Sequence, residues 1–254
     1  MSEPETMSNM QKIYILLRKQ TGHDFSNYKQ NTIFRRIERR MAVHHIEKIK
    51  YYIRYLQENP KEIETLFKEL LIGVTGFFRD CDAFESLKNK VLSEYLKEKP
   101  NDYSLRIWVP GCSTGEEVYS IAIIVKECME LLNKDFNVQI FGTDIDADAI
   151  ETARVGIYPM LIANDVGYER LQRFFTEDGN SYRISKVIRE MIVFAPQNII
   201  KEPPFTKLDL LSCRNLLIYL NYELQKKIYP LFHYALKPNG YSFFRHIRNH
   251  RVFR

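Results

Sequence analysis

The residues best placed for chemistry surround a glycine-bounded turn. The segment 106–117 reads RIWVPGCSTGEE, in which a strand-like apolar run leads into a turn between Gly111 and Gly115, and an amphipathic helix follows. The next apolar run, 138–143, ends at Asp144. Strand, glycine turn, helix and a second strand with an acidic tip form the layout of a nucleotide-binding βαβ unit. In such a unit the turn brings backbone N–H groups close to the ligand, and the acid can hold both hydroxyls of a ribose.

Two further carboxylates narrow down the ligand. Glu116 and Glu117 stand at the N-terminus of the helix, where a dinucleotide site needs uncharged residues because a pyrophosphate sits there. Two carboxylates would repel a diphosphate, but they suit a ligand that combines ribose and adenine with a positive charge. That description fits S-adenosylmethionine (SAM). Which of the two glutamates contacts it stays open.

The size and composition of the chain limit the classes of protein to which it can belong. With 254 residues, 45% of them hydrophobic, it is long enough for one large or two small globular domains. No run of about 18 apolar residues is present, and the polar, acidic N-terminus is no secretory signal, so we expect a cytoplasmic protein without membrane insertion. Neither a disulfide framework nor a metal site is expected, because no two cysteines form a CxxC pair. The cysteines are Cys81, Cys112, Cys128 and Cys213.

Positive charge is concentrated near the start of the chain. Residues 28–54 hold eight Lys or Arg against two Glu, a net charge of +6. In the predicted helix 28–43, Phe34, Ile37 and Met41 share one face at helical spacing. We expect the opposite face to be either a solvated surface or a docking surface for an acidic partner. The residues of that face are Arg35, Arg36, Arg39 and Arg40.

The order of the predicted elements indicates two domains. Apolar residues at three-to-four spacing predict helices at 11–19, 28–43, 48–58 and 62–72. The polar segment KEKPND at 97–102 is the expected linker, which divides a helical domain, 1–97, from a second domain, 98–254. Beyond it, strands at 104–109, 138–143, 190–196, 207–213 and 240–244 alternate with helices at 115–132, 146–154 and 221–236. This alternation predicts an α/β fold whose parallel sheet is covered on both faces. A hairpin signal within 165–190 predicts a small antiparallel β insertion.

Two short motifs allow other chemistry. The turn 111–115 also matches G-x-S-x-G, the nucleophile elbow of α/β-hydrolases, with Ser113 as nucleophile. Such an elbow follows several strands, whereas only predicted helices precede the single strand that leads into this turn. The segment EPPF at 202–205 resembles the (D/N/S)PP(Y/F/W) loop of methyltransferases that act on exocyclic amines of bases. It precedes the predicted fourth strand rather than following it, which favours a simple turn into that strand.

Seven segments taken in order resemble the CheR family, the chemoreceptor glutamate methyltransferases. The resemblance runs from about residue 33 to residue 240. Each motif is weak alone, and their order and spacing together are specific. The segments are TIFRRIERRM, LLIGVTGFFRDCDAF, RIWVPGCSTGEEVYSIAI, FGTDIDADAIETARVGIY, RFF, FAPQNI and LLSCRNLLIYL.

The resemblance implies an activity and a set of site residues. It implies an all-α N-terminal domain on a Rossmann-like SAM-dependent methyltransferase domain, and methyl transfer from SAM to chemoreceptor glutamates, giving glutamyl methyl esters and S-adenosylhomocysteine. Tyr219 would lie beside the methyl group, and the arginine face of helix 28–43 would meet the receptor helices. The implied cofactor-binding residues are Gly73, Thr75, Arg79, Gly111, Glu116, Glu117, Asp144, Asn198, Ile199, Asn215 and Leu216.

The implied chemistry agrees with the residues present. A glutamate carboxylate has a pKa of about 4.3 and is already an anion at neutral pH, so it needs no general base. Positioning of the reactants is then the main task, and it can lower a barrier by several kcal/mol. Arg79 is the candidate for holding a carboxylate through two hydrogen bonds. Whether that carboxylate belongs to the substrate or to the methionine part of SAM stays open.

Two departures from the family pattern are visible. After Gly240 the chain reads YSFF and then RHIRNHRVFR, where the family has a further strand, a G-x-x-E turn and a final strand pair. We therefore expect the edge of the sheet to be incomplete, in a chain that is a piece of a longer protein or has an altered terminus. The predicted hairpin at 174–185 is short, so we expect no binding of a receptor's C-terminal pentapeptide there.

Two other functions are weighed against receptor methylation. One is a catalytically impaired SAM-binding module for docking or regulation, which the incomplete edge would favour and the retention of Arg79, Asn215 and Tyr219 opposes. The other is a nucleic-acid methyltransferase whose basic helix grips phosphates and whose binding depends steeply on salt. The modest net charge of +5 opposes it, and we expect no nucleic-acid partner.

Overall fold

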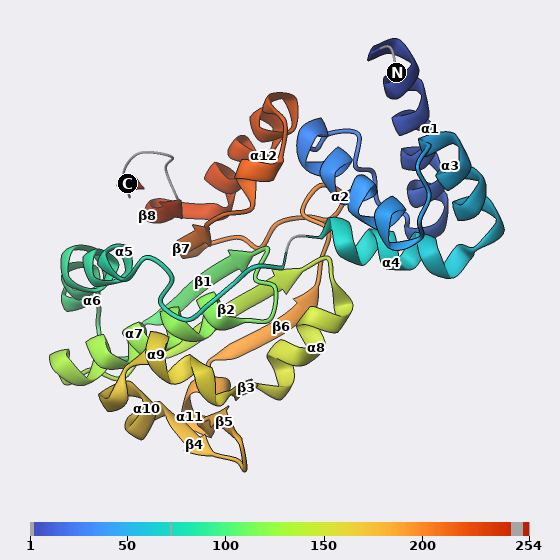
Figure 1. Cartoon of the computed structure of the whole chain (residues 1–254). Coiled ribbons are helices and arrows are strands. Elements are labelled where there is room, and N and C mark those ends of the chain that lie inside the picture. Colours follow the sequence, from blue (N-terminus) through green and yellow to red (C-terminus); the bar gives the residue numbers. More distant parts are fainter. Residues whose placement is uncertain (1–2, 72, 245–250, 254) are drawn as a thin grey trace. The chain divides into compact units, whose positions relative to one another are not determined.

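The computed structural model describes residues 3–71, 73–244 and 251–253. The chain forms two compact units (Figure 1). Unit 1 consists of Met1–Ile72 and Leu217–Lys227, and unit 2 of Gly73–Leu216 and Ile228–Arg254. Among the described residues, no helix is both long and apolar enough to cross a membrane.

Unit 1 is built from helices. Pro60 starts the fourth of them, as expected of a proline that lacks an N–H at a helix N-terminus. The first four helices each bury one face in a common core, which holds Leu17, Phe25, Ile37 and Leu56 among others. The helices are α1 (Glu3–Thr21), α2 (Gln30–Val43), α3 (Ile49–Glu58), α4 (Pro60–Leu70), the short 3-10 helix η3 (Leu217–Tyr219) and the start of α12 (Tyr222–Ala235).

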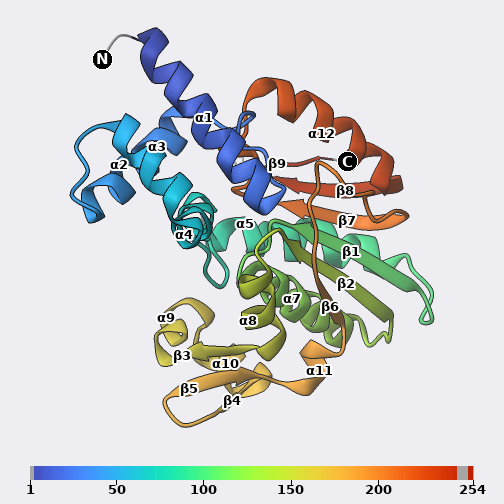
Figure 2. The same ribbon diagram turned by 90° about the vertical axis from the view of Figure 1, so that its right-hand side faces the viewer.

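Unit 2 contains the predicted parallel sheet, which confirms the α/β fold. Its strand order is β6-β2-β1-β7-β8-β9, and neighbouring strands are parallel except β8 and β9 (Figure 2). The strand order reverses its direction between β1 and β7. At such a reversal, open α/β sheets bind ligands at the carboxyl ends of their strands. The strands are β1 (Ser104–Pro110), β2 (Asn137–Asp144), β6 (Ile192–Pro196), β7 (Leu208–Cys213), β8 (Leu236–Phe244) and β9 (Arg251–Phe253).

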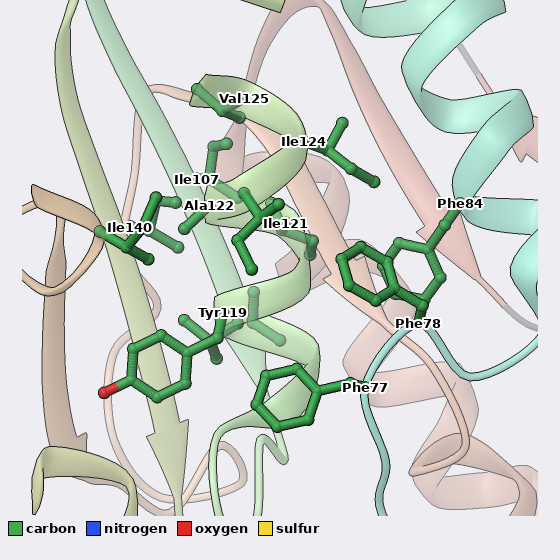
Figure 3. Close-up of a cluster of buried hydrophobic side chains, with 14 of the residues drawn as sticks. Phe77, Phe78, Phe84, Ile107, Tyr119, Ile121, Ala122, Ile124, Val125 and Ile140 are labelled. Atoms are coloured by element: carbon green, nitrogen blue, oxygen red, sulfur yellow. The ribbon is translucent and has the colours of Figure 1, made fainter. Parts of the chain in front are cut away.

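Both faces of this sheet are covered. On one face α7 (Glu116–Leu132) is buried almost throughout, and its Tyr119 and Ile121 pack with Ile107 and Ile140 of the strands (Figure 3). On the other face, Trp108 meets Phe232 of α12 edge to face, with ring centroids 5.8 Å apart. Consecutive residues of β1, Ile107 and Trp108, thus face opposite layers, as the two-residue period of a strand requires.

One buried carboxylate joins three strands at their amino ends. Asp209, 1% exposed, accepts hydrogen bonds from the hydroxyls of Tyr95 and Tyr103 at 2.7 and 2.5 Å. The Arg106 backbone N–H donates to it at 2.7 Å, and the Lys237 ammonium at 2.9 and 3.0 Å. Asp209 therefore ties β7 to β1, to β8 and to the helical segment before β1.

A small antiparallel sheet is inserted after β2, and the predicted hairpin is part of it. Its order is β3-β5-β4, and it lies on the same side of the main sheet as α7 (Figures 1 and 2). The remaining strand of this sheet, β3, lies outside the predicted hairpin. It was not predicted, because its three residues are too short to show an alternating pattern. The strands are β3 (Ile157–Pro159), β4 (Phe175–Glu177) and β5 (Ser181–Ile184).

Shorter helices complete unit 2. The segment α5, η1 and α6 packs its buried Phe84, Leu87 and Leu96 into the core of this unit. The division between the units therefore falls after Ile72, not at the polar segment 97–102 where a linker was expected. These helices are α5 (Cys81–Ser86), the π-helix η1 (Leu87–Leu92), α6 (Ser93–Lys97), α8 (Ala147–Val155), the 3-10 helix η2 (Met160–Ile162), α9 (Ala163–Val166), α10 (Tyr168–Phe174) and α11 (Lys186–Arg189).

The C-terminal edge of the sheet is formed by β9 in the part of the chain that the structure describes. Part of the segment predicted to leave it incomplete, residues 245–250 and 254, lies outside the described residues. Of the remainder, Arg251–Phe253 forms β9, which pairs antiparallel with β8. One strand thus follows β8, and the incomplete edge stays a prediction.

Candidate functional site

The glycine turn after β1 can be built only with glycine at its two ends. Gly111 and Gly115 have φ angles of +71° and +94°, in the left-handed region that favours glycine. A Cβ atom at Gly111 would approach the Leu216 side chain to 2.9 Å, and one at Gly115 would approach Ala153 to 2.8 Å. The turn is therefore held close both to the segment after β7 and to α8.

Asp144 at the tip of β2 is held beside this turn. Its Oδ2 accepts the Ser113 backbone N–H at 2.7 Å, and its Oδ1 accepts the Asp146 backbone N–H at 3.0 Å. Burial raises the pKa of Asp144, an effect that these two hydrogen bonds partly offset. Each carboxylate oxygen retains a lone pair, so the group can accept further hydrogen bonds from two hydroxyls of a ligand.

Glu116 and Glu117 leave the first turn of α7 toward different partners. The Thr114 hydroxyl donates to Glu116 at 2.7 and 2.9 Å, and a hydrogen bond from the Thr75 side chain also lowers the pKa of Glu116. The Ser212 hydroxyl donates to Glu117 at 2.6 Å. Burial dominates for both carboxyls and raises their pKa. Such groups bind a cationic ligand favourably, because it stabilises their charged forms.

The loop 73–80 lies against the glycine turn. The Ser113 hydroxyl donates to the Gly73 carbonyl at 3.3 Å. Farther along the loop, the Arg79 guanidinium donates to the Val74 carbonyl at 2.8 Å, and its charge acts on Glu117. The structure thereby brings Gly73, Thr75 and Arg79 together with Gly111, Glu116 and Glu117, although 30 or more residues separate the two groups in sequence.

The strands β6 and β7 add the remaining predicted residues of unit 2. Asn198 and Ile199 follow β6, whose end is tied to β2 by a 2.8 Å hydrogen bond from the Gln197 N–H to the Asp144 carbonyl. Asn215 follows β7 with a φ of +66°. Its buried Nδ2 has no hydrogen-bond partner among the described residues. A buried donor of this kind suits a ligand acceptor, because leaving it unsatisfied costs about 1–3 kcal/mol.

This donor set fits SAM. Asp144 suits the two ribose hydroxyls, the Asn215 amide suits an acceptor on the ligand, and the acids of α7 suit the positive charge of the sulfonium. These residues come from the carboxyl ends of neighbouring parallel strands, as open α/β sheets require of a ligand site.

Tyr219 and the four arginines of α2 belong to unit 1. The Tyr219 carbonyl accepts the Lys29 backbone N–H at 2.9 Å, which attaches η3 to the start of α2. Tyr219 is half-buried.

The arginines of α2 do not form the uniform exposed face that was expected. Arg40 is largely buried and donates two hydrogen bonds to Glu62, at 2.9 and 2.7 Å. Arg36 and Arg39 both contact Glu69, at 3.4 and 3.1 Å. Acids on α4 thus neutralise part of the predicted charge.

Arg35 and Arg39 are the exposed members of this set. Arg39 is 72% exposed, and Arg35 forms no ion pair within the part of the chain that the structure describes. The buried face of α2 also differs slightly, because Ile33 is buried with Ile37 and Met41 whereas Phe34 is half-buried.

The two alternative motifs have structural explanations. Ser113 donates its hydroxyl proton toward a carbonyl rather than toward a base, which is not the arrangement of an activated nucleophile. Phe205 of the EPPF segment stacks on Phe141, with ring centroids 4.1 Å apart and planes 15° apart, and meets Trp108 edge to face. Its ring packs against the sheet, which supports the interpretation of EPPF as a turn into β7.

The sequence interpretation missed two polar residues at the end of β7. Ser212 is buried and donates to Glu117, and Arg214 is buried against the loop 73–80. A signal was present, since Ser212 interrupts an otherwise apolar strand end and Arg214 directly precedes Asn215.

Comparison with known proteins assigns both parts of the chain. Residues 73–246 match the family model described as CheR methyltransferase, SAM binding domain, and residues 8–71 match CheR methyltransferase, all-alpha domain. A chemotaxis protein methyltransferase of Borreliella burgdorferi is 29% identical over 248 residues, covering 95% of this chain and 88% of that protein. An uncharacterized 104.1 kDa protein of Rhodobacter capsulatus is 40% identical over 220 residues, covering 87% of this chain. The match spans only 23% of that longer protein.

Among solved structures, a SAM-dependent methyltransferase from Mesorhizobium loti is similar to this chain. The match has a TM-score of 0.33 and 16% identity, and it covers 63% of this chain and 54% of that chain.

Proposed function

The chain belongs to the CheR methyltransferase family, whose cofactor is SAM, and from this we propose that it transfers a methyl group to glutamate side chains of chemoreceptors. The products are glutamyl methyl esters and S-adenosylhomocysteine. The observation that carries the proposal is the family match in both domains, 8–71 and 73–246, supported by the similarity to chemotaxis methyltransferases over most of the chain. We place this protein-glutamate O-methyltransferase in the cytoplasm.

The residues of unit 2 have separate roles in this proposal. Asp144 holds the ribose, and Asn198, Ile199, Asn215 and Leu216 contact the rest of the nucleoside. Gly111, which has no side chain, allows the nucleoside to approach the backbone of the turn closely. Glu116 and Glu117 favour the positive charge.

The reaction itself demands little acid–base chemistry from the protein. SAM supplies a methyl group on a sulfonium, which is a good leaving group. The acceptor carboxylate is ionised at neutral pH and needs no base. The Arg79 guanidinium uses one donor for the Val74 carbonyl and has others for a carboxylate, which it can hold in a fixed orientation. Tyr219 is the second residue with a proposed part in the reaction, and we propose that it lies beside the transferred methyl group.

The partner that we propose is the cytoplasmic helical part of a chemoreceptor. Its acidic helices suit the exposed guanidinium groups of Arg35 and Arg39 on α2, with Arg36 and Arg40 supporting that surface from within unit 1. We propose neither a nucleic-acid partner nor a pentapeptide tether.

A comparison of acceptors tests this proposal. The purified chain is incubated with methyl-tritiated SAM and either a chemoreceptor cytoplasmic fragment or duplex DNA, and protein-bound and DNA-bound label are counted. We expect label on the receptor alone, and its loss when excess S-adenosylhomocysteine competes. Label on DNA, or none on either acceptor, would contradict receptor methylation.

Replacement of Arg79 should reduce turnover. In Arg79→Ala we expect turnover with receptor to fall at least about tenfold, because the carboxylate is no longer held in place. Arg173→Ala is the matched control, since Arg173 pairs with Glu130 on the surface of the same unit. Calorimetry with S-adenosylhomocysteine identifies the carboxylate that Arg79 holds. Weaker binding in the variant would indicate the methionine carboxylate of the cofactor, and unchanged binding with slower turnover would indicate the carboxylate of the substrate. Normal turnover with unchanged affinity would rule out both roles.

Cofactor affinity should fall as the pH is lowered. Burial raises the pKa of Glu116, Glu117 and Asp144, so acidification protonates them earlier than ordinary carboxyls. A cationic ligand stabilises the charged forms, so binding lowers these pKa values and releases protons. Affinity should therefore drop by up to about tenfold per pH unit for each proton released.

The proton release can be measured directly. Calorimetric titrations of the chain with SAM at mildly acidic pH, in two buffers of different ionisation enthalpy, should give different apparent binding enthalpies. The Glu116→Gln variant should release fewer protons on binding, because it lacks one of the carboxyls that titrate. Identical affinities at acidic and neutral pH, without buffer dependence, would show that these carboxyls do not respond to the ligand.

A further inference from the structure

Arg214 is a buried cation next to a predicted site residue. It directly follows β7 and precedes Asn215, and its side chain is only 1% exposed. A buried guanidinium is tolerated only when it is paired and hydrogen-bonded. The contacts of Arg214 therefore indicate what it does.

Both ends of its guanidinium contact the loop 73–80. Nη1 donates to the Arg79 carbonyl at 2.8 Å, and Nη2 donates to Asp80 Oδ2 at 2.7 Å. Its central carbon lies 5.0 Å from the ring centroid of Phe84 and 4.8 Å from that of Phe243, two rings that also contact each other edge to face. The planar fork thus joins the end of β7 to two successive residues of the loop, which a lysine could not do in the same way.

The loop needs such an anchor. It has no regular secondary structure, and its Phe78 and Asp80 have φ angles of +47° and +64°, which non-glycine residues rarely adopt. A conformation of this kind persists only where surrounding contacts impose it. The burial of Phe78 and a 2.9 Å hydrogen bond from its N–H to Ser120 fix one side of Arg79, and Arg214 fixes the other.

The Arg79 side chain itself is weakly held. It is half-buried, and the hydrogen bond that it donates is to the Val74 carbonyl in the same loop. The direction of its guanidinium therefore depends on its backbone.

We propose that Arg214 is a positioning residue for methyl transfer, which fixes the Arg79 backbone and the Asp80 carboxylate and so aims the Arg79 guanidinium at the carboxylate that it holds. This inference rests on the proposed function, since it assigns a support to the residue proposed to hold a reactant. The charge of Arg214 also acts on Glu117 and partly offsets the rise that burial causes in the pKa of that carboxyl.

A double-mutant cycle tests the proposal. Arg214→Lys keeps the charge but loses the fork, and Asp80→Asn keeps the shape of the partner but loses its charge. In each variant kcat/KM for the receptor fragment should fall at least about fivefold. In an Arg79→Ala background the same changes should cost less than about twofold, because the side chain that they position is gone. Arg173→Ala should leave kcat/KM unchanged in both backgrounds.

A merely structural role predicts a different pattern. Loss of activity by the same factor with and without Arg79 would overturn positioning, and so would unchanged kcat/KM in Arg214→Lys. If thermal melting shows that Arg214→Lys does not fold, the cycle with Asp80→Asn decides, because that carboxylate is partly exposed. A wild-type chain without transfer to the receptor would overturn the proposed function and this inference with it. Normal wild-type transfer with an unaffected Arg214→Lys would overturn only the inference.

Discussion

Asp209→Ala should lower the free energy of unfolding by about 3–5 kcal/mol, the usual effect of removing one partner from a buried ion pair. The substitution would leave the Lys237 ammonium without its carboxylate and would remove the acceptor of the Tyr95 and Tyr103 hydroxyls and of the Arg106 N–H. Such a loss is a large part of the stability of an ordinary domain, which is about 5–15 kcal/mol. Urea unfolding, monitored by circular dichroism, measures this change in the free energy of unfolding.

Two variants define the scale of this effect. Asp102→Ala removes an exposed aspartate of the same unit and should change stability by less than about 0.5 kcal/mol. Tyr95→Phe removes one donor and should cost about 1 kcal/mol. If Asp209→Ala were no more costly than Tyr95→Phe, the view that Asp209 joins the strands would be wrong.

Asp144→Ala should weaken the binding of S-adenosylhomocysteine at least about tenfold, or about 1.4 kcal/mol at 25 °C. Hydrogen bonds to a charged group contribute about 1.5–3 kcal/mol each, and the proposed ribose contact involves two hydroxyls. The same carboxylate accepts the Ser113 and Asp146 N–H groups, so its loss also loosens the turn after β1. Isothermal calorimetry measures the affinity.

The exposed Asp102 again provides the control for this result. Asp102→Ala should bind the ligand as the wild type does, and the melting temperature of Asp144→Ala shows whether the variant is folded at the temperature of the titration. Unchanged affinity in folded Asp144→Ala would exclude the ribose role.

The sequence was sufficient to predict that unit 2 contains a parallel sheet with helices on both faces. Glycines with positive φ are required at 111 and 115, and apolar runs of strand length alternate with amphipathic helices, so the local pattern and the fold agree. The position of Asp144 followed from the same reasoning, because neighbouring parallel strands end at one edge of the sheet.

Features that depend on distant partners could not be predicted in this way. Arg40 is buried because Glu62, on another helix, pairs with it, and no helical wheel of α2 contains that information. The division after Ile72 depends on how Phe84, Leu87 and Leu96 pack, whereas composition alone favoured the polar segment 97–102. The role of Arg214 likewise depends on a loop more than 130 residues earlier.

The chemical nature of the bond formed on the receptor tests the central claim most directly. A receptor fragment labelled by the chain from methyl-tritiated SAM is treated with mild alkali, and volatile radioactivity is collected. A methyl ester of glutamate should release its label as methanol, and a fragment whose acceptor glutamates are replaced by alanine should carry no label. Label that survives alkali, or that remains on the alanine-substituted fragment, would show that the methyl group is not transferred to glutamate carboxylates.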